Sequence, residues 1–347
     1  MKLVMILNDI YNEILPSSTI KMAFTATLLG HEVWISDVAN FSYYPNETLH
    51  AFAVKAKGKN FKNPEKYYEH IVSEKSQKER ILIDECDILM LRNDPAADFD
   101  KPWAQHSSLV FGRSAVRHGV IVLNDPDGLS KAINKMYFQQ FPKIVRLKSL
   151  ISKNPKEIRE FYLENNKEII LKPLQGSAGR NVFYAGPNDE NNLNQMINAI
   201  SRDGYVIAEE FFPKALEGDV RLFLMNGKPL KVNGKYAAFK RVRSQGDIRS
   251  NIHAGGHAYK AEVTDKMLEI ADIVRPKLVQ DGMFLVGLDI VGDKLLEINV
   301  FSPGGLDNAQ KFEGVNFAEA VIEALEKKVR YKNYYKKNFD NIELNTL

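Results

Sequence analysis

One segment, from Phe284 to Gly305, limits the possible folds of this chain more than any other. It reads F-L-V-G-L-D-I-V-G-D-K-L-L-E-I-N-V-F-S-P-G-G. Apolar and β-branched residues on both sides of Gly292-Asp293 predict two short strands joined by a turn, and therefore a β-hairpin.

The length of the turn decides which side chains share a face of this hairpin. If the connection has an odd number of residues, for example Gly292 to Lys294, then Asp289 lies opposite Glu297. Asn299 follows on the same face. The other face is then entirely apolar and can be buried. Its residues are Val286, Leu288, Ile290, Leu296, Ile298 and Val300. A two-residue connection would mix polar and apolar side chains on both faces, so we predict the odd connection.

The polar face of the hairpin predicts a metal site. Two carboxylates and an amide oxygen suit a hard cation such as Mg²⁺, which completes its coordination with water and phosphate oxygens. A solvated polar face would satisfy the same pattern. The glycines of Ser302-Pro303-Gly304-Gly305 favour a binding site, because they let backbone N–H groups approach a carboxylate or phosphate.

Composition narrows the class of protein. The chain has 347 residues, 44% hydrophobic and 26% charged, which is typical of a soluble globular protein with two or three domains. It shows no signal peptide and no apolar run of membrane-spanning length, and its single cysteine, Cys86, fits a reducing compartment. We therefore expect a cytoplasmic protein with no membrane partner. A net charge of only +3 gives no reason to expect nucleic acid.

The first third of the chain predicts a parallel sheet. Strands at Lys2–Leu7 and His31–Ile35 flank a helix over Thr19–Leu29, a β-α-β pattern. Residues 40–80 lack clear periodicity, and we expect a long insertion or flap there. Arg92 follows the strand at Ile88–Leu91, at the edge where open α/β sheets bind ligands, although a surface ion pair would explain it equally well.

Two lysines and a glycine loop predict contacts with phosphate. Lys135 lies on a predicted helix over Gly128–Phe138, and Lys172 ends a strand. The loop Gln175–Arg180 then closes a hairpin. It is not the strand-to-helix turn of a Walker loop, and we interpret it as a flap over phosphates.

The remainder of the chain predicts further strands, two helices and a cationic region. Asn226-Gly227 and Asn233-Gly234 are strong hairpin signals. Helices are expected over residues 265–280 and 316–326, and the tail from Lys327 is expected to be peripheral. An anionic substrate would fit a polar set made of Arg221, Arg241, Arg249, Asn251, Gly255 and Gly256.

Four motifs together resemble the ATP-grasp superfamily, and most closely its bacterial glutathione synthetases. They are I-I-L-K-P-L-Q-G-S-A-G, E-G-D-V-R, R-S-N-I-H-A-G-G and G-L-D-I-V-G-D-K-L-L-E-I-N-V-F-S-P. The resemblance implies an α/β fold with a Rossmann-like, parallel-sheet pre-ATP-grasp domain over residues 1–123. A two-lobed ATP-grasp fold would follow, with a linker helix and lid over 124–210, a metal-binding subdomain over 211–326 and a basic tail over 327–347.

The resemblance also implies a role for each candidate residue. Lys135 and Lys172 would contact ATP phosphates, and the loop Gly176, Ser177, Ala178 and Gly179 would close over them. Glu209, Glu210 and Phe211 would line the adenine, and Glu217 would hold the ribose. Asp289, Glu297 and Asn299 would hold two Mg²⁺ ions, or Mn²⁺ in their place.

The implied reaction is the ATP-dependent joining of glycine to γ-glutamylcysteine through an acyl phosphate. Arg221, Arg241, Arg249 and Asn251 would hold the acyl phosphate and the oxyanion, and Gly255 and Gly256 would supply N–H groups. Arg92, Ser302, Gly304 and Gly305 would bind the substrate. Family relatives also imply a homo-oligomer, either a dimer or a tetramer.

Two departures from the family pattern leave the substrates open. The run Ser302 to Asn308 lacks the basic or amide residue and the glutamate that follow Ser-Pro in the family, and His253 is similar to ligases that add glutamate to proteins or peptides. The alternatives are a sister ligase with another dipeptide or amino acid and a non-catalytic nucleotide-binding protein. The second is disfavoured, because every predicted metal and phosphate ligand is present.

Overall fold

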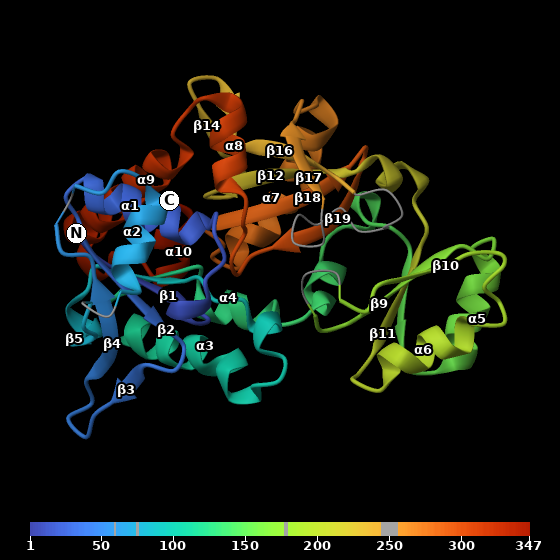
Figure 1. Ribbon diagram of the computed structural model, residues 1–347, viewed down its shortest axis with the longest axis horizontal. Coiled ribbons are helices and arrows are strands. Elements are labelled where there is room, and N and C mark those ends of the chain that lie inside the picture. Colours follow the sequence, from blue (N-terminus) through green and yellow to red (C-terminus); the bar gives the residue numbers. More distant parts are fainter. Residues whose placement is uncertain (59, 74–75, 177–179, 244–255) are drawn as a thin grey trace.

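Three large β-sheets and one two-stranded sheet are present in the part of the chain that the structure describes. The computed structural model describes residues 1–58, 60–73, 76–176, 180–243 and 256–347. In Figure 1 the sheet of the first third lies at the left, the sheet with the predicted metal hairpin lies above the centre, and a smaller lobe lies at the right. In the described part of the chain, no helix is long and apolar enough to span a bilayer.

The first sheet has the predicted parallel centre, with antiparallel strands added at one edge. Its order is β3-β4-β2-β1-β6-β7, with β5 paired to β4. The strands are β1 (Lys2–Leu7), β2 (Glu32–Asp37), β3 (Phe41–Tyr43), β4 (Leu49–Lys55), β5 (Glu79–Leu82), β6 (Ile88–Leu91) and β7 (Ile121–Leu123). Strands β2, β1, β6 and β7 are parallel. The prediction of a long insertion or flap over residues 40–80 was wrong, because β3, β4 and β5 extend this sheet and α2 (Pro64–Ile71) lies between β4 and β5 in the chain.

Helices cover the first sheet, and some come from the far end of the chain. They are α1 (Ser18–Leu28), α3 (Pro102–Arg117), α9 (Phe317–Tyr335) and α10 (Asn341–Thr346). Helix α9 packs beside α1, and Asn341 exchanges hydrogen bonds with the backbone of Val122. The prediction of a peripheral tail was therefore wrong: Lys328 has no exposed surface and donates to the carbonyl oxygens of Leu344 and Asn345.

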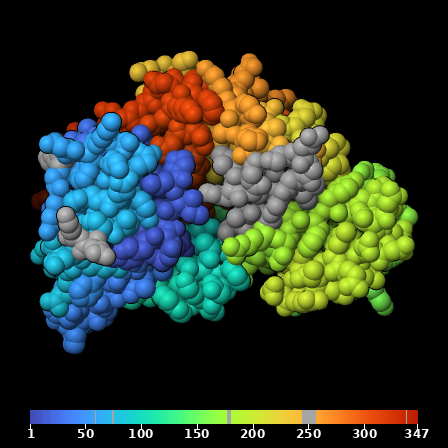
Figure 2. Space-filling model, viewed as in Figure 1, coloured from blue at the N-terminus to red at the C-terminus, as the bar shows by residue number. Residues whose placement is uncertain are grey.

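The second sheet belongs to a lobe with its own core. Its antiparallel order is β10-β9-β11-β8, from β8 (Ser149–Ser152), β9 (Ile169–Pro173), β10 (Phe183–Ala185) and β11 (Val206–Glu210). Helices α5 (Pro155–Glu164) and α6 (Leu193–Ser201) pack on it around Tyr162, Leu171 and Ile197. Strands β9 and β10 pair on either side of the glycine loop, as predicted. Figure 2 shows this lobe, in yellow-green, projecting from the rest of the molecule.

The third sheet carries the predicted hairpin. Its order is β17-β16-β12-β18-β19, from β12 (Asp219–Met225), β13 (Lys228–Pro229) paired to it, β16 (Ala238–Val242), β17 (His257–Lys260), β18 (Leu285–Val291) and β19 (Lys294–Asn299). Strands β14 (Lys231–Val232) and β15 (Lys235–Tyr236) pair separately. Both predicted Asn-Gly turns are present, with positive φ at each residue. Helix α7 (Asp265–Gln280) has the predicted span, and α8 (Leu306–Glu313) follows the hairpin.

A β-bulge, and not an odd turn, sets the faces of the hairpin. Val291 pairs with Lys294 across a two-residue turn, and Ile290 pairs with Leu295. The register then shifts by one residue, so that Asp289 pairs with Glu297 as predicted. The predicted burial of Leu296 was wrong, because Leu295 takes the core position and Leu296 lines a cleft.

Between the first two sheets the chain makes short helical turns. Helix α4 (Pro126–Lys131) ends before Lys135, which opens a separate 3₁₀ turn over Lys135–Gln140. The prediction of one helix over Gly128–Phe138 was therefore wrong. The side chain of Asn134 caps the new turn by accepting from Met136 N, which places Lys135 at its start.

Candidate functional site

Neighbouring strands of the third sheet bring opposite charges into one row. Arg221 on β12 pairs in register with Asp289 on β18, which in turn pairs with Glu297 on β19. On the other side of β12, Arg221 pairs with Phe239, and Asp219, two residues away, pairs with Arg241 on β16. The row of charges therefore runs diagonally across four adjacent strands.

Asp289 is the most heavily bonded member of this row. Its side chain is buried, and Arg221 donates to both of its oxygens at 2.7 Å. Arg241 Nη2 lies 2.8 Å from Oδ2, and Asn299 donates to the same oxygen at 3.1 Å. Burial alone would raise the pKa of Asp289, but the two guanidinium groups outweigh it and lower the pKa to about 2.

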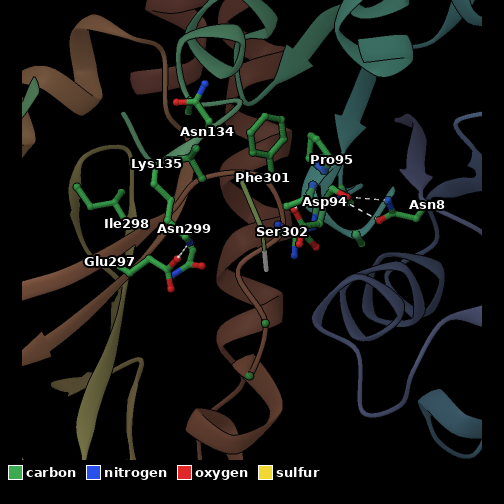
Figure 3. A pocket seen from close by; sticks show the side chains of 18 of the residues that line it. Asn8, Asp94, Pro95, Asn134, Lys135, Glu297, Ile298, Asn299, Phe301 and Ser302 are labelled. Atoms are coloured by element: carbon green, nitrogen blue, oxygen red, sulfur yellow. Dashed lines mark hydrogen bonds and ion pairs between the residues drawn. The ribbon is translucent and has the colours of Figure 1, made fainter. Parts of the chain in front are cut away.

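Lys135 lies against the second predicted metal ligand. Its Nζ is 2.5 Å from Glu297 Oε1, and its backbone N–H donates to the carbonyl of Leu174, just beyond β9. Burial opposes both charges, but their mutual attraction prevails: the pKa of Lys135 is raised and that of Glu297 is lowered. Figure 3 shows Lys135, Glu297 and Asn299 on one wall of the pocket, with Asn8 and Asp94 across from them.

The free oxygens on this wall fit a hard divalent cation. Among the described residues, Glu297 Oε2 and Asn299 Oδ1 accept from no donor and lie on this wall, whereas Asp289 is buried behind it and its Oδ1 accepts from one donor. No group of three or more His, Cys, Asp or Glu residues suited to a metal occurs in the described part of the chain. A cation here would therefore depend on the amide oxygen and on oxygens from water or phosphate.

A second lysine lies on the lobe with α5 and α6. Lys172 on β9 donates to both oxygens of Glu209 on β11, at 2.8 and 3.0 Å. Both side chains line the same cleft as Lys135 and Glu297. Two lysines from different elements thus face one space.

The loop after β19 is fixed by two arginines and a serine. Arg221 Nη1 donates to the carbonyl of Gly304, Arg92 Nη2 donates to that of Pro303, and Ser18 Oγ accepts from Leu306 N. Gly305 has φ +95°, and a Cβ there would lie 2.3 Å from Phe239 Cζ. Only glycine fits this position without displacing a buried ring.

These groups line one cleft of about 640 Å³ between the three sheets. Of the predicted site residues, Lys135, Lys172, Gly176, Glu209, Arg221, Arg241, Glu297, Asn299, Arg92, Ser302, Gly304 and Gly305 all line it. Two lysines and three arginines thus surround a carboxylate and amide wall. Such a cleft can hold a polyanion, a divalent cation and a further anionic group.

Comparison with known proteins decides the family. Residues 1–130 match the model of the prokaryotic glutathione synthetase N-terminal domain, and residues 134–314 match that of the prokaryotic glutathione synthetase ATP-grasp domain. The chain belongs to the prokaryotic glutathione synthetase family. It is an ATP-dependent ligase with the ATP-grasp fold.

Individual members of the glutathione synthetase family match most of the chain. The glutathione synthetase of Synechococcus elongatus is 32% identical, covering 89% of this chain and 93% of its own. That of Agrobacterium fabrum is 35% identical, covering 73% and 76%. The fold is shared with D-cycloserine synthetase DcsG, at a TM-score of 0.61 and 13% identity, covering 93% of this chain and 99% of that one.

Several other predicted site residues are not among those that line the cleft. Asp289 is buried behind Arg221 and Arg241, Glu210 accepts from Lys148 N, and the ring of Phe211 packs against Tyr184. Glu217 is exposed, and Gly256 is buried just before β17. The predicted residues Ser177, Ala178, Gly179, Arg249, Asn251 and Gly255 lie outside the described residues.

Sequence reasoning missed two parts of this glutathione synthetase site. Asp219 binds Arg241 at 2.6 Å and lies two residues before Arg221, on the same face of β12; strand alternation could have identified it. The N-terminus of α1 also lines the cleft. The run Ser17-Ser18-Thr19 before an apolar segment could have indicated it, because such a run is typical of the start of a helix.

Proposed function

We propose that this protein joins glycine to γ-glutamylcysteine, using ATP and two Mg²⁺ ions, with Mn²⁺ as an alternative metal. The observation that carries the proposal is the row of charges across four strands. It sets two arginines, a lysine and a set of metal-suited oxygens around one cleft. The relatives named glutathione synthetase support the choice of substrates.

In this proposal the cysteinyl carboxylate of the dipeptide attacks the γ-phosphorus of ATP. The bond to ADP breaks, and an acyl phosphate forms. The amine of glycine then attacks the acyl carbon, the peptide bond forms, and inorganic phosphate leaves with the electron pair of the C–O bond. No protein nucleophile is required, so the chain contributes positioning and charge.

Each part of the cleft then has a role. Lys135 and Lys172 bind phosphate oxygens, and Glu209 keeps Lys172 in place. Arg221 and Arg241, held by Asp289 and Asp219, stabilise the negative charge of the acyl phosphate and of the tetrahedral intermediate. Asp289, Glu297 and Asn299 would hold the Mg²⁺ ions, which neutralise charge on the transferred phosphate when bound.

The experiment is ADP release by purified protein with ATP and Mg²⁺. γ-Glutamylcysteine and glycine are added separately and then together, with mass spectrometry of the product. Release that needs both substrates and yields the tripeptide supports the proposal. Release with a different dipeptide or amine from a wider panel would instead assign a sister ligase, and the Gly304-Gly305 loop would be the place to look for the change.

We also propose a cytoplasmic homo-oligomer, either a dimer or a tetramer. The single cysteine, Cys86, is buried, and burial raises the pKa of its thiol to about 12, which suits a structural role. Trp103 and Val110, two turns apart on α3, are more than half exposed and supply apolar surface. Light scattering of the purified protein measures the oligomeric state.

A further inference from the structure

A buried carboxylate at the end of α7 accepts from three side chains. Asp281 has no exposed surface and directly follows the last residue of α7. Lys131 Nζ lies 2.7 Å from its Oδ1, and Tyr137 Oη and Lys277 Nζ each lie 2.9 Å from its Oδ2. Burial alone would raise the pKa of Asp281, but the bonds from these three donors outweigh it and lower the pKa. The carboxylate is therefore ionised and can hold all three donors.

Two of these donors come from the segment that carries Lys135. Lys131 is the last residue of α4, and Tyr137 lies two residues after Lys135 in the 3₁₀ turn. Between them the chain runs through a connector, residues 132–134. Lys277 lies on α7 itself, one turn before Asp281, so its bond holds nothing outside that helix. Asp281 therefore ties both ends of the segment around Lys135 to one point.

The backbone at the end of α7 also packs closely against α4. The N–H of Asp125, at the start of α4, donates to the carbonyl of Gly282 at 3.1 Å. A Cβ at Gly128 would lie 1.8 Å from the carbonyl oxygen of Asp281, so a side chain there would displace backbone. Helix α4 is thus held against the end of α7 along its length. Lys131 and Tyr137 extend this attachment past the connector.

Tyr137 links the attachment to the cleft. It is buried, lines the cleft and packs edge-on against the ring of Phe141. Burial and the charge of Asp281 raise the pKa of Tyr137, so its hydroxyl stays a donor. Lys135, two residues earlier, bonds Leu174 through its backbone and Glu297 through its side chain (Figure 3). A shift of the 3₁₀ turn would therefore move the ammonium group of Lys135 in the cleft.

We propose that Asp281 is a positioning residue, which acts through Lys131 and Tyr137 to hold Lys135 where it binds a phosphate of ATP. The inference rests on the proposed function, which gives Lys135 this role. A lysine binds phosphate as a point charge on a flexible stem, so the place of its backbone decides where the charge can reach. Because the backbone is fixed in advance, less conformational entropy is lost when ATP binds.

The test removes the donors one at a time, because replacing the buried Asp281 itself can unfold the protein. Tyr137→Phe and Lys131→Met each release one end of the segment. Each should weaken ATP binding about three- to tenfold in calorimetry. Lys277→Met removes a donor from the same carboxylate but not from the segment, so it should leave ATP affinity unchanged. If Lys277→Met weakens ATP binding as much as the other two, the role of Asp281 is only structural and the inference is wrong.

A double-mutant cycle shows whether the effect passes through Lys135. In a protein that already carries Lys135→Met, Tyr137→Phe should have no further effect on ATP affinity. A general loss of stability would not depend on the side chain at position 135. An equal loss of affinity in both backgrounds would therefore overturn the inference.

Failure of the proposed function gives a different pattern. If Lys135→Met binds ATP as tightly as the wild type does, the phosphate role proposed for Lys135 is wrong. The positioning by Asp281 is then judged by amide hydrogen exchange of the ATP-free protein. Residues 132–138 should exchange faster in Tyr137→Phe and Lys131→Met than in the wild type, and at the wild-type rate in Lys277→Met. Equal exchange in all four proteins would show that Asp281 does not fix this segment.

Discussion

Lys135 Nζ lies 2.5 Å from Glu297 Oε1, so the lysine proposed to bind phosphate is bonded to the carboxylate proposed to bind metal. A metal that takes Glu297 Oε1 and a phosphate that takes Lys135 would each compete with this contact. We therefore expect either ligand to lower the cost of binding the other, and by linkage the effect would be reciprocal.

Glu297→Gln tests this relationship. It should lower ADP release at least about 100-fold, because it removes the charge that the metal needs. Without metal, the variant should bind ATP at least as tightly as the wild type, because Lys135 no longer has a carboxylate partner. Calorimetry with and without Mg²⁺ measures both effects. Exposed Glu323→Gln on α9 is the matched control, and full activity of Glu297→Gln would remove the metal assignment.

Lys172→Met should weaken ATP binding about 10- to 100-fold through loss of a charged phosphate contact. It also leaves Glu209 buried without its partner, so thermal stability should fall. Adding Glu209→Gln should restore the melting temperature but not the affinity. If Lys172→Met binds the nucleotide as tightly as the wild type does, this lysine does not contact the phosphates.

Gly305→Ala should lower stability by about 1–3 kcal/mol, because its Cβ would overlap the buried ring of Phe239 and φ is +95°. Gly304→Ala is a close control, since a Cβ there meets nothing within 4 Å. Urea unfolding of the two variants gives the comparison. Equal stabilities would show that the ring moves aside at little cost.

Asp289→Asn should destabilise the fold by about 3–5 kcal/mol at neutral pH, because two buried guanidinium groups lose their shared carboxylate. The folded-state pKa of Asp289, about 2, lies below its unfolded value, so its stabilising effect is complete above about pH 4 and is lost as the pH falls through 2. The stability difference between wild type and variant should therefore shrink in acid. Asp293→Asn, in the exposed turn, is the control for the loss of a surface aspartate.

The alternation of polar and apolar residues, with the Gly292-Asp293 turn, was enough to predict the pairing of Asp289 with Glu297. The β-α-β pattern was enough to predict the parallel centre of the first sheet. Neither pattern could predict the bulge, because a bulge and an odd turn give the same pairing at Asp289. Residues 40–80 were misinterpreted because β3 and β5, with three and four residues, are too short to show a period, and they pair with β4 only in the folded chain. The buried tail was missed because its lysines suggested a solvated surface, whereas Lys328 is held by carbonyl oxygens.

The ion pairs of the site were the least predictable part. Arg221 and Asp289 are 68 residues apart, and their contact depends on the register of β12 against β18. No local pattern specifies that register. The same holds for Arg92, whose contacts with Thr19 on α1 and with the carbonyl of Pro303 depend on how distant segments pack together.

Because of the bulge after Leu295, the pairing of Asp289 with Glu297 does not depend on which side chain lines the cleft beside it. Leu296 is the additional residue, and it faces the cleft without altering the pairing of Asp289 with Glu297. A chain one residue shorter here would keep the metal geometry and lose an apolar wall of the cleft. Insertion and deletion at this single position can therefore tune the fit of a ligand while the chemistry beside it stays the same.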